Sequence, residues 1–88
     1  MTSMRDMQLE LTDRLGVKVD DIFAVADIIS TDEQATKAAE YLNLQILMVE
    51  LDENDHFCES GLITLKKAYN KIHDKFPEVT EKVHPKYE

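Results

Sequence analysis

The feature that most restricts the fold is a pair of stretches whose apolar residues recur at alternating steps of three and four. The first stretch covers residues 32–51, and its apolar positions are Ala35, Ala39, Leu42, Ile46 and Val49. This spacing keeps the apolar side chains on one side of a helix. Ser30 with Glu33 forms one potential capping box ahead of it, and Thr31 with Gln34 forms a second. The sequence therefore predicts one long helix over residues 32–51.

The second half of this stretch permits one alternative, a break at Asn43 followed by a strand over residues 44–51. The Leu, Gln, Met and Glu residues found there favour a helix. A half-buried strand requires strict alternation of apolar and polar residues, and this alternation fails at Leu47. We therefore expect an all-α fold, with an α+β fold that has a strand at 44–51 as the alternative.

The second stretch covers residues 62–76 and follows a polar loop, residues 52–61, that ends in a turn at Gly61. Its apolar positions are Leu62, Leu65, Tyr69, Ile72 and Phe76. Its other face carries the lysines Lys66, Lys67, Lys71 and Lys75. Two helices with matched apolar rows pack against each other when a loop joins them. We therefore expect a long antiparallel helical hairpin.

The remaining segments are shorter and are expected to cover the hairpin. Residues 4–15 carry apolar residues at helical spacing, and Gly16 can end that helix with a positive φ. Residues 21–29 leave little polar face, which is typical of a helix buried at the centre, although their β-branched content also permits a strand. A short helix is expected over residues 78–84, and fraying beyond residue 85. The result is a compact bundle of four to five helices.

Length and composition indicate a single helical domain, residues 1–88, because the chain is too short for two. Cys58 is the only cysteine, which excludes an intrachain disulfide and suits the reducing cytoplasm. No apolar run approaches the ~20 residues of a membrane span, so no membrane insertion is expected. Because so short a chain buries a thin core, a homodimer that shares part of the apolar rows is an alternative to a monomer.

The net charge of −8 is unevenly distributed along the chain. Residues 1–60 hold fourteen acidic and four basic residues, a net −10, whereas residues 61–88 hold four acidic and six basic ones, a net +2. An acidic body repels phosphate backbones, so we expect no direct binding of nucleic acid. A recognition helix over residues 32–51 would offer only Lys37 as a basic contact. The charge is compatible with simple solubility and with steering toward a basic partner.

The polar loop begins like a calcium-binding loop. Asp52 and Asn54 match the first and third positions of such a loop. The sixth position should be glycine and is Phe57, and the twelfth should be glutamate and is Ile63. The calcium pattern is therefore incomplete, and we expect no calcium site.

His56, Cys58 and His73 are the other candidates for chemistry. They could supply ligands to a transition metal, but only two of them lie close in sequence. Cys58 with either histidine could form a nucleophile and base, but a single cysteine in a thin core is more often a small buried hydrophobe. No glycine-rich phosphate loop or nucleophile elbow is present. We therefore expect no enzyme, no catalytic residues, no metal and no cofactor.

The stretch Leu15-Gly16-Val17 to Asp20-Asp21-Ile22 resembles the start of an acyl carrier protein, a family that is also small, acidic and helical. The resemblance implies a serine that carries the prosthetic group, in an Asp-Ser-Leu motif at the start of the next long helix. The nearest match is Glu59-Ser60-Gly61-Leu62, which comes far later and leaves too little chain for the remaining helices. We therefore expect no working carrier.

Protein binding is the function class that these exclusions leave. We expect a small, acidic, non-enzymatic regulatory or inhibitor protein that acts by protein–protein interaction, similar in style to the accessory proteins that bacteriophages use. The alternatives are a nucleic-acid mimic that blocks a basic partner, and an acyl-carrier-like or metal-binding domain. An acidic surface would meet a basic partner, and the lysine face would meet an acidic one. The acidic candidates are Asp13, Asp20, Asp21, Asp27, Asp52, Glu53 and Asp55, and the basic candidates are Lys66, Lys67 and Lys71.

Overall fold

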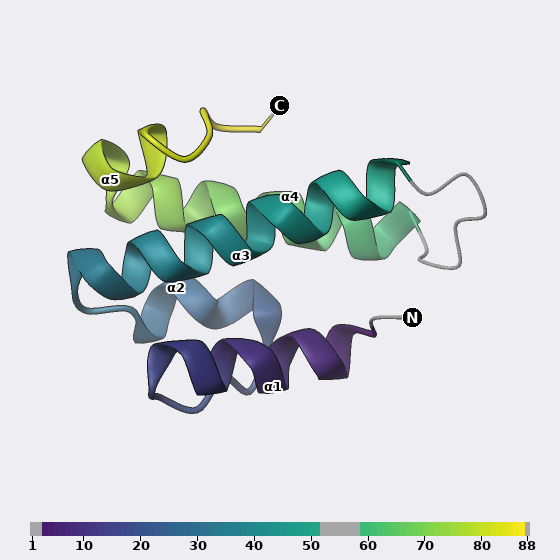
Figure 1. Cartoon of the computed structure of the whole chain (residues 1–88), viewed down its shortest axis with the longest axis horizontal. Helices are drawn as coiled ribbons and strands as arrows, with labels where there is room; N and C mark the ends of the chain where they lie inside the picture. The colour runs from purple at the N-terminus through teal and green to yellow at the C-terminus, as the bar shows by residue number, and fades with distance from the viewer. Residues whose placement is uncertain (1–2, 52–58, 88) are drawn as a thin grey trace.

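The computed structural model describes residues 3–51 and 59–87, and helices form its architecture (Figure 1). The elements are α1 (Met4–Leu15), a 3-10 turn η1 (Ile22–Ala24), α2 (Val25–Ile28), α3 (Asp32–Leu51), α4 (Glu59–Lys75) and α5 (Pro77–Glu81). The described residues contain no strand, so the all-α prediction is confirmed. The alternative strand at 44–51 is wrong, because those residues complete α3.

The predicted antiparallel hairpin of α3 and α4 forms the centre of the fold. Figure 1 shows the two helices side by side and running in opposite directions. The first apolar row is buried through Ala35, Ala39, Leu42 and Ile46, and the second through Leu65, Tyr69 and Ile72. Burying one aliphatic side chain of this size stabilises a fold by about 1.5–3 kcal/mol. On the outside of the hairpin, α1 packs against α3, while η1 and α2 pack against α4.

Local capping fixes both ends of α1, and the C-terminal end is the one predicted at Gly16. The Asp6 backbone N–H donates to Ser3 Oγ at 3.2 Å, and the Ser3 backbone N–H donates to Asp6 Oδ2 at 3.3 Å. These two bonds make a complete capping box. At the other end Gly16 has a φ of 73°, a left-handed conformation that glycine adopts without a steric cost.

Gln34 ties the start of α3 to the end of α1. Its backbone N–H donates to Thr31 Oγ1 at 3.1 Å, which confirms Thr31 as a capping residue. Its side-chain oxygen accepts from the Ser30 backbone N–H at 2.9 Å, and its side-chain nitrogen donates to the Leu15 carbonyl at 3.2 Å. Glu33 pairs with Lys37 at 3.1 Å instead of closing a box with Ser30. One side chain therefore caps a helix and fixes the packing of two.

Two predictions about where helices begin and end are wrong, because tertiary packing determines the structure there. The single helix expected over residues 21–29 is η1 followed by α2, since a segment this short depends on tertiary contacts and both pieces are packed against α4. Asp21 caps it, accepting from the Phe23 backbone N–H at 3.1 Å. Gly61 lies inside α4, where it is buried, rather than in a turn.

The C-terminal segment is anchored where fraying was expected. The Asn70 side-chain amide donates to the Tyr87 carbonyl and accepts from the Tyr87 backbone N–H, both at 2.7 Å. The Tyr87 hydroxyl bonds to Asn43 on α3, and its ring stacks on His84 with centroids 4.2 Å apart. The Tyr69 hydroxyl lies 3.0 Å from the Thr80 carbonyl and 2.5 Å from the His84 carbonyl. Long-range side-chain bonds therefore hold this segment to the hairpin.

The Tyr69→Phe variant tests this anchor. Burial, reinforced by Tyr87, raises the pKa of Tyr69 from 10.0 to about 12. Because the folded state disfavours the phenolate, the contribution of Tyr69 to stability is fully present below pH ~10 and is lost as pH rises from about 10 to 12. We expect the variant to lose about 1 kcal/mol of unfolding free energy at pH 7. In urea titrations the difference from wild type should shrink above pH 10, and a constant difference up to pH 11 would contradict the assignment.

Candidate functional site

The described acidic candidates are all exposed, but they do not form one row. Asp13 lies near the end of α1, Asp20 and Asp21 lie between α1 and η1, and Asp27 lies in α2. Asp20 is 3.6 Å from the Lys18 ammonium, and Asp21 is the cap of η1. At least one of the predicted partner-binding carboxylates therefore has a structural function. The other three predicted residues, Asp52, Glu53 and Asp55, lie outside the described residues.

The lysine face is partly occupied by contacts within the protein. Lys66 pairs with Glu50 on α3 at 3.0 Å, and Lys71 lies 4.1 Å above the centroid of the Phe23 ring. Lys75 donates to the Ala26 carbonyl at 2.9 Å and to the Ile29 carbonyl at 2.7 Å. Lys67 is exposed. The face that the sequence predicts as a binding surface therefore also fastens α4 to α2, η1 and α3.

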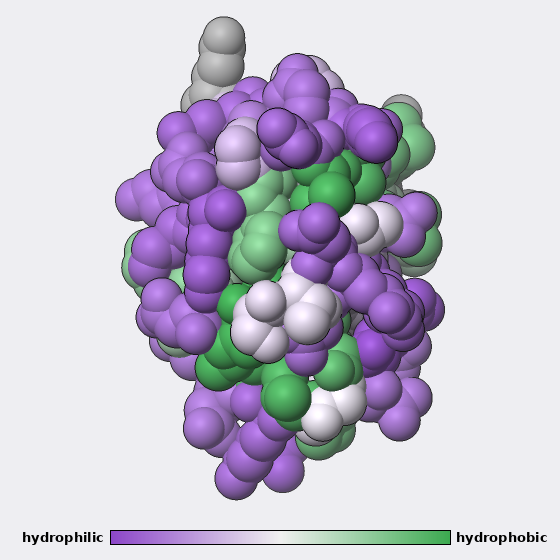
Figure 2. All heavy atoms as spheres, turned by 90° about the vertical axis from the view of Figure 1, so that its left-hand side faces the viewer, coloured by the Kyte–Doolittle hydropathy of each residue, from purple (hydrophilic) through white to green (hydrophobic). Residues whose placement is uncertain are grey.

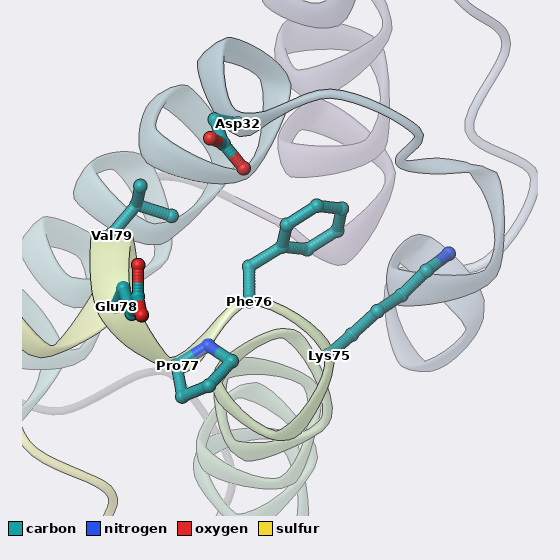
Figure 3. Close-up of a pocket in the computed structure, with 6 residues that line it drawn as sticks. All are labelled: Asp32, Lys75, Phe76, Pro77, Glu78 and Val79. Carbon is teal, nitrogen blue, oxygen red and sulfur yellow. The ribbon is translucent and has the colours of Figure 1, made fainter.

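A pocket of about 250 Å³ lies where α3 begins, α4 ends and α5 begins (Figure 3). The ring of Phe76 extends toward the segment leading into α3, whereas Lys75 extends toward α2. Figure 2 views this end of the molecule and shows apolar side chains in the middle of a polar border. The pocket is lined by Asp32, Lys75, Phe76, Pro77, Glu78 and Val79. It offers a partly apolar surface with two carboxylates and the Lys75 ammonium, which donates to the backbone carbonyls of Ala26 and Ile29.

A histidine–carboxylate pair borders a second, shallower hollow between the end of α4 and α5. His73 Nε2 lies 2.6 Å from Glu81 Oε2, and the hollow is completed by Pro77, Glu78 and Lys82. Such a pair can orient a general base, but these lining residues include no Ser, Thr or Cys for it to activate. The other predicted metal and catalytic candidates, His56 and Cys58, lie outside the described residues. Within the described residues, no three His, Cys, Asp or Glu side chains gather as a metal site.

The most distinctive exposed surface is a row of apolar side chains on the second half of α3. The exposed fractions of Leu44, Leu47, Met48 and Leu51 are 51%, 42%, 53% and 79%. Steps of three, one and three place the four residues on one side of a helix. Leu42 and Ile46, which are fully buried, lie on the opposite side. We call Leu44, Leu47, Met48 and Leu51 the outer stripe.

Charged residues surround the outer stripe. Glu40, one turn before Leu44 on the same face of α3, is exposed. On the α1 side, Arg14 pairs with Glu10 at 3.0 Å and lies 5.0 Å from the Tyr41 ring centroid. Burial raises the pKa of Tyr41, and the nearby carboxylates of Glu10 and Asp6 raise it further against the opposing effect of Arg14. Glu40 therefore places a carboxylate in line with the outer stripe, and the Glu10–Arg14 ion pair lies beside Tyr41 on the α1 side.

Sequence reasoning did not single out the outer stripe, although its signal was present. The helix over residues 32–51 carries two apolar rows, and only one of them can face the core of a small bundle. Leu47 breaks the alternation of a strand, and the same residue belongs to the second apolar row of this helix. A helix with an apolar row left over after its core row is assigned is the pattern that indicates an exposed binding face.

No protein-family model matches the chain, and comparisons with curated proteins and with solved structures find no match. Across residues 3–51 and 59–87, no helix combines the length and apolar character needed to cross a membrane.

Lys75 and Lys67 provide a matched test of which lysines are structural. Both lie on α4, one two turns after the other, but only Lys75 bonds the carbonyls at the end of α2. We expect Lys75→Met to lower the free energy of unfolding by about 1–2 kcal/mol, because hydrogen bonds from a charged group are lost. Lys67→Met should change it by less than about 0.5 kcal/mol. Chemical denaturation measures both, and equal effects would show that the Lys75 bonds do not stabilise the fold.

Proposed function

We propose that this protein is a non-enzymatic regulatory or inhibitor domain that binds another protein through the outer stripe of α3. The observation that carries the proposal is the exposure of Leu44, Leu47, Met48 and Leu51 on one helical face. Single exposed apolar residues are ordinary on protein surfaces. A contiguous row that exposes a few hundred Å² marks an interaction site more often than chance.

The setting of the outer stripe favours binding over a passive role. α3 contacts α1, α4 and α5, and its opposite face is fully buried at Leu42 and Ile46. A side chain presented on a helix that is held this firmly loses little backbone freedom when a partner binds. Leucine and methionine also suit a docking surface, since methionine adapts its shape to what it contacts.

A non-enzymatic function is supported by what lines the two hollows. The pocket at the start of α3 has two carboxylates, Asp32 and Glu78, beside Phe76 and Val79, and the shallower hollow has His73 with Glu81. Neither lining includes a Ser, Thr or Cys that such a carboxylate or histidine could activate. Small size and an acidic balance fit a regulator or inhibitor, including an accessory protein of the bacteriophage kind, and the lone cysteine fits a cytoplasmic setting.

The double variant Leu47→Glu/Met48→Glu tests this function. Leu9→Glu is the control, because Leu9 is an exposed leucine on α1, 60% exposed, and lies outside the outer stripe. We expect the wild type and the control to recover the same partner protein from an extract of the source cell, and the double variant to recover about tenfold less. All three proteins should unfold within about 0.5 kcal/mol of one another, since the altered residues are exposed. Equal recovery by the wild type and the double variant would refute docking at the outer stripe.

A further inference from the structure

We infer that the partner presents an amphipathic helix with an apolar row flanked by lysine or arginine, and that this helix lies along the outer stripe. The inference rests on the proposed function and adds the chemistry of the partner. It follows from the spacing of the outer stripe, from the charges that border it, and from a comparison with the surface that self-association would need.

The spacing of the outer stripe fits another helix. From Leu44 to Leu51 the row follows the steps i, i+3, i+4 and i+7, which extend for about 10 Å along α3. A partner helix with the same periodicity can place its own apolar row against these four side chains, in the way that amphipathic helices dock on apolar surfaces. An extended strand would need an open sheet edge, and the described residues contain no strand.

The charges on the border favour a basic partner. Glu40 continues the line of the outer stripe toward the N-terminus of α3, and Asp6 and Glu10 act on Tyr41 from the α1 side. The cations on these sides are in ion pairs, Arg14 with Glu10, Lys37 with Glu33 and Lys66 with Glu50, so the pairs add little net charge and Glu40 adds a negative one. The chain as a whole carries −8. Basic residues that flank an apolar row would therefore approach an attractive field.

A second copy of the chain fits the outer stripe less well. A stable homodimer buries about 1,600 Å² or more in total, and two stripes of a few hundred Å² each supply about half of that. Two copies would also bring together two bodies of net charge −8, which repel at low salt. We therefore do not infer that a second copy of the chain binds the outer stripe, and the experiment includes a measurement that would detect self-association.

A synthetic helix provides the probe. It is a fluorescein-labelled peptide of 18 residues built from leucine and lysine, with its leucines at i, i+3, i+4 and i+7 on one face. One control peptide has the same composition in an order that leaves no apolar face, and another has glutamate in place of every lysine. Fluorescence anisotropy measures binding to the wild-type protein, to Leu47→Glu/Met48→Glu and to Leu9→Glu. Sedimentation velocity of the free proteins reports self-association.

The inference predicts micromolar binding of the basic helix, about tenfold weaker binding of the scrambled peptide, and no binding of the acidic one. Affinity should fall about tenfold between ~0.05 and 0.5 M salt, because the flanking charges are screened. The double variant should bind about tenfold more weakly and Leu9→Glu within twofold of wild type. Added glutamates increase the attraction for a basic peptide, so a loss confined to the double variant identifies the apolar contact.

Three results would overturn the inference. The first is equal binding of the basic and acidic helices, and the second is equal binding of the basic helix by wild type and the double variant. The third is a dimer of the wild type that the Leu47→Glu/Met48→Glu variant abolishes. If the basic peptide does not bind while the Leu47→Glu/Met48→Glu variant still loses its natural partner, the outer stripe remains a docking surface. Only the inference that the partner presents a basic helix is then refuted. If neither the helix nor a natural partner depends on the outer stripe, both proposals fail.

Discussion

The burial of one apolar row of α3 against one of α4 is the interaction on which the rest of the structure depends. A chain of 88 residues is long enough for only one small hydrophobic core. The face of α3 that carries Leu42 and Ile46 packs into that core against α4. α1 and α5 then pack against other parts of α3. The outer stripe is the part of the same helix that this arrangement cannot reach, and its exposure is therefore a consequence of the core packing.

Local chemistry explains why much of the fold could be predicted. The ends of α1 follow from Ser3, Asp6 and Gly16, which act within a few residues of one another. The wrong predictions concern segments whose structure depends on contacts with residues far away in the sequence. The short helix α2 ends beneath Lys75, forty-six residues beyond Ile29, and Tyr87 is held by Asn70 and Asn43. The local sequence of these segments does not predict such long-range hydrogen bonds, because the bonds depend on how the helices pack in space.

The same distinction applies to the candidate site. The sequence alone could not separate charged residues with a structural function from those available to a partner. In the structure Asp21 caps η1, and Lys66 forms an ion pair with Glu50. The outer stripe was predictable in principle from the period of α3. Periodicity alone does not say which of the two apolar rows of α3 faces the core, so Leu47 and Met48 could not be assigned to the surface without the packing of the other helices.

The acidity of the chain and its exposed apolar row have a common explanation under the proposed function. An exposed row of leucine and methionine favours contact with any apolar surface, including a second copy of the chain. A net charge of −8 opposes the approach of a second copy and of other acidic proteins, because like charges repel over about a Debye length. It does not oppose a basic helix, which gains from the same field. The charge therefore supplies selectivity, whereas the outer stripe supplies the contact area, and neither feature alone would distinguish one partner from another.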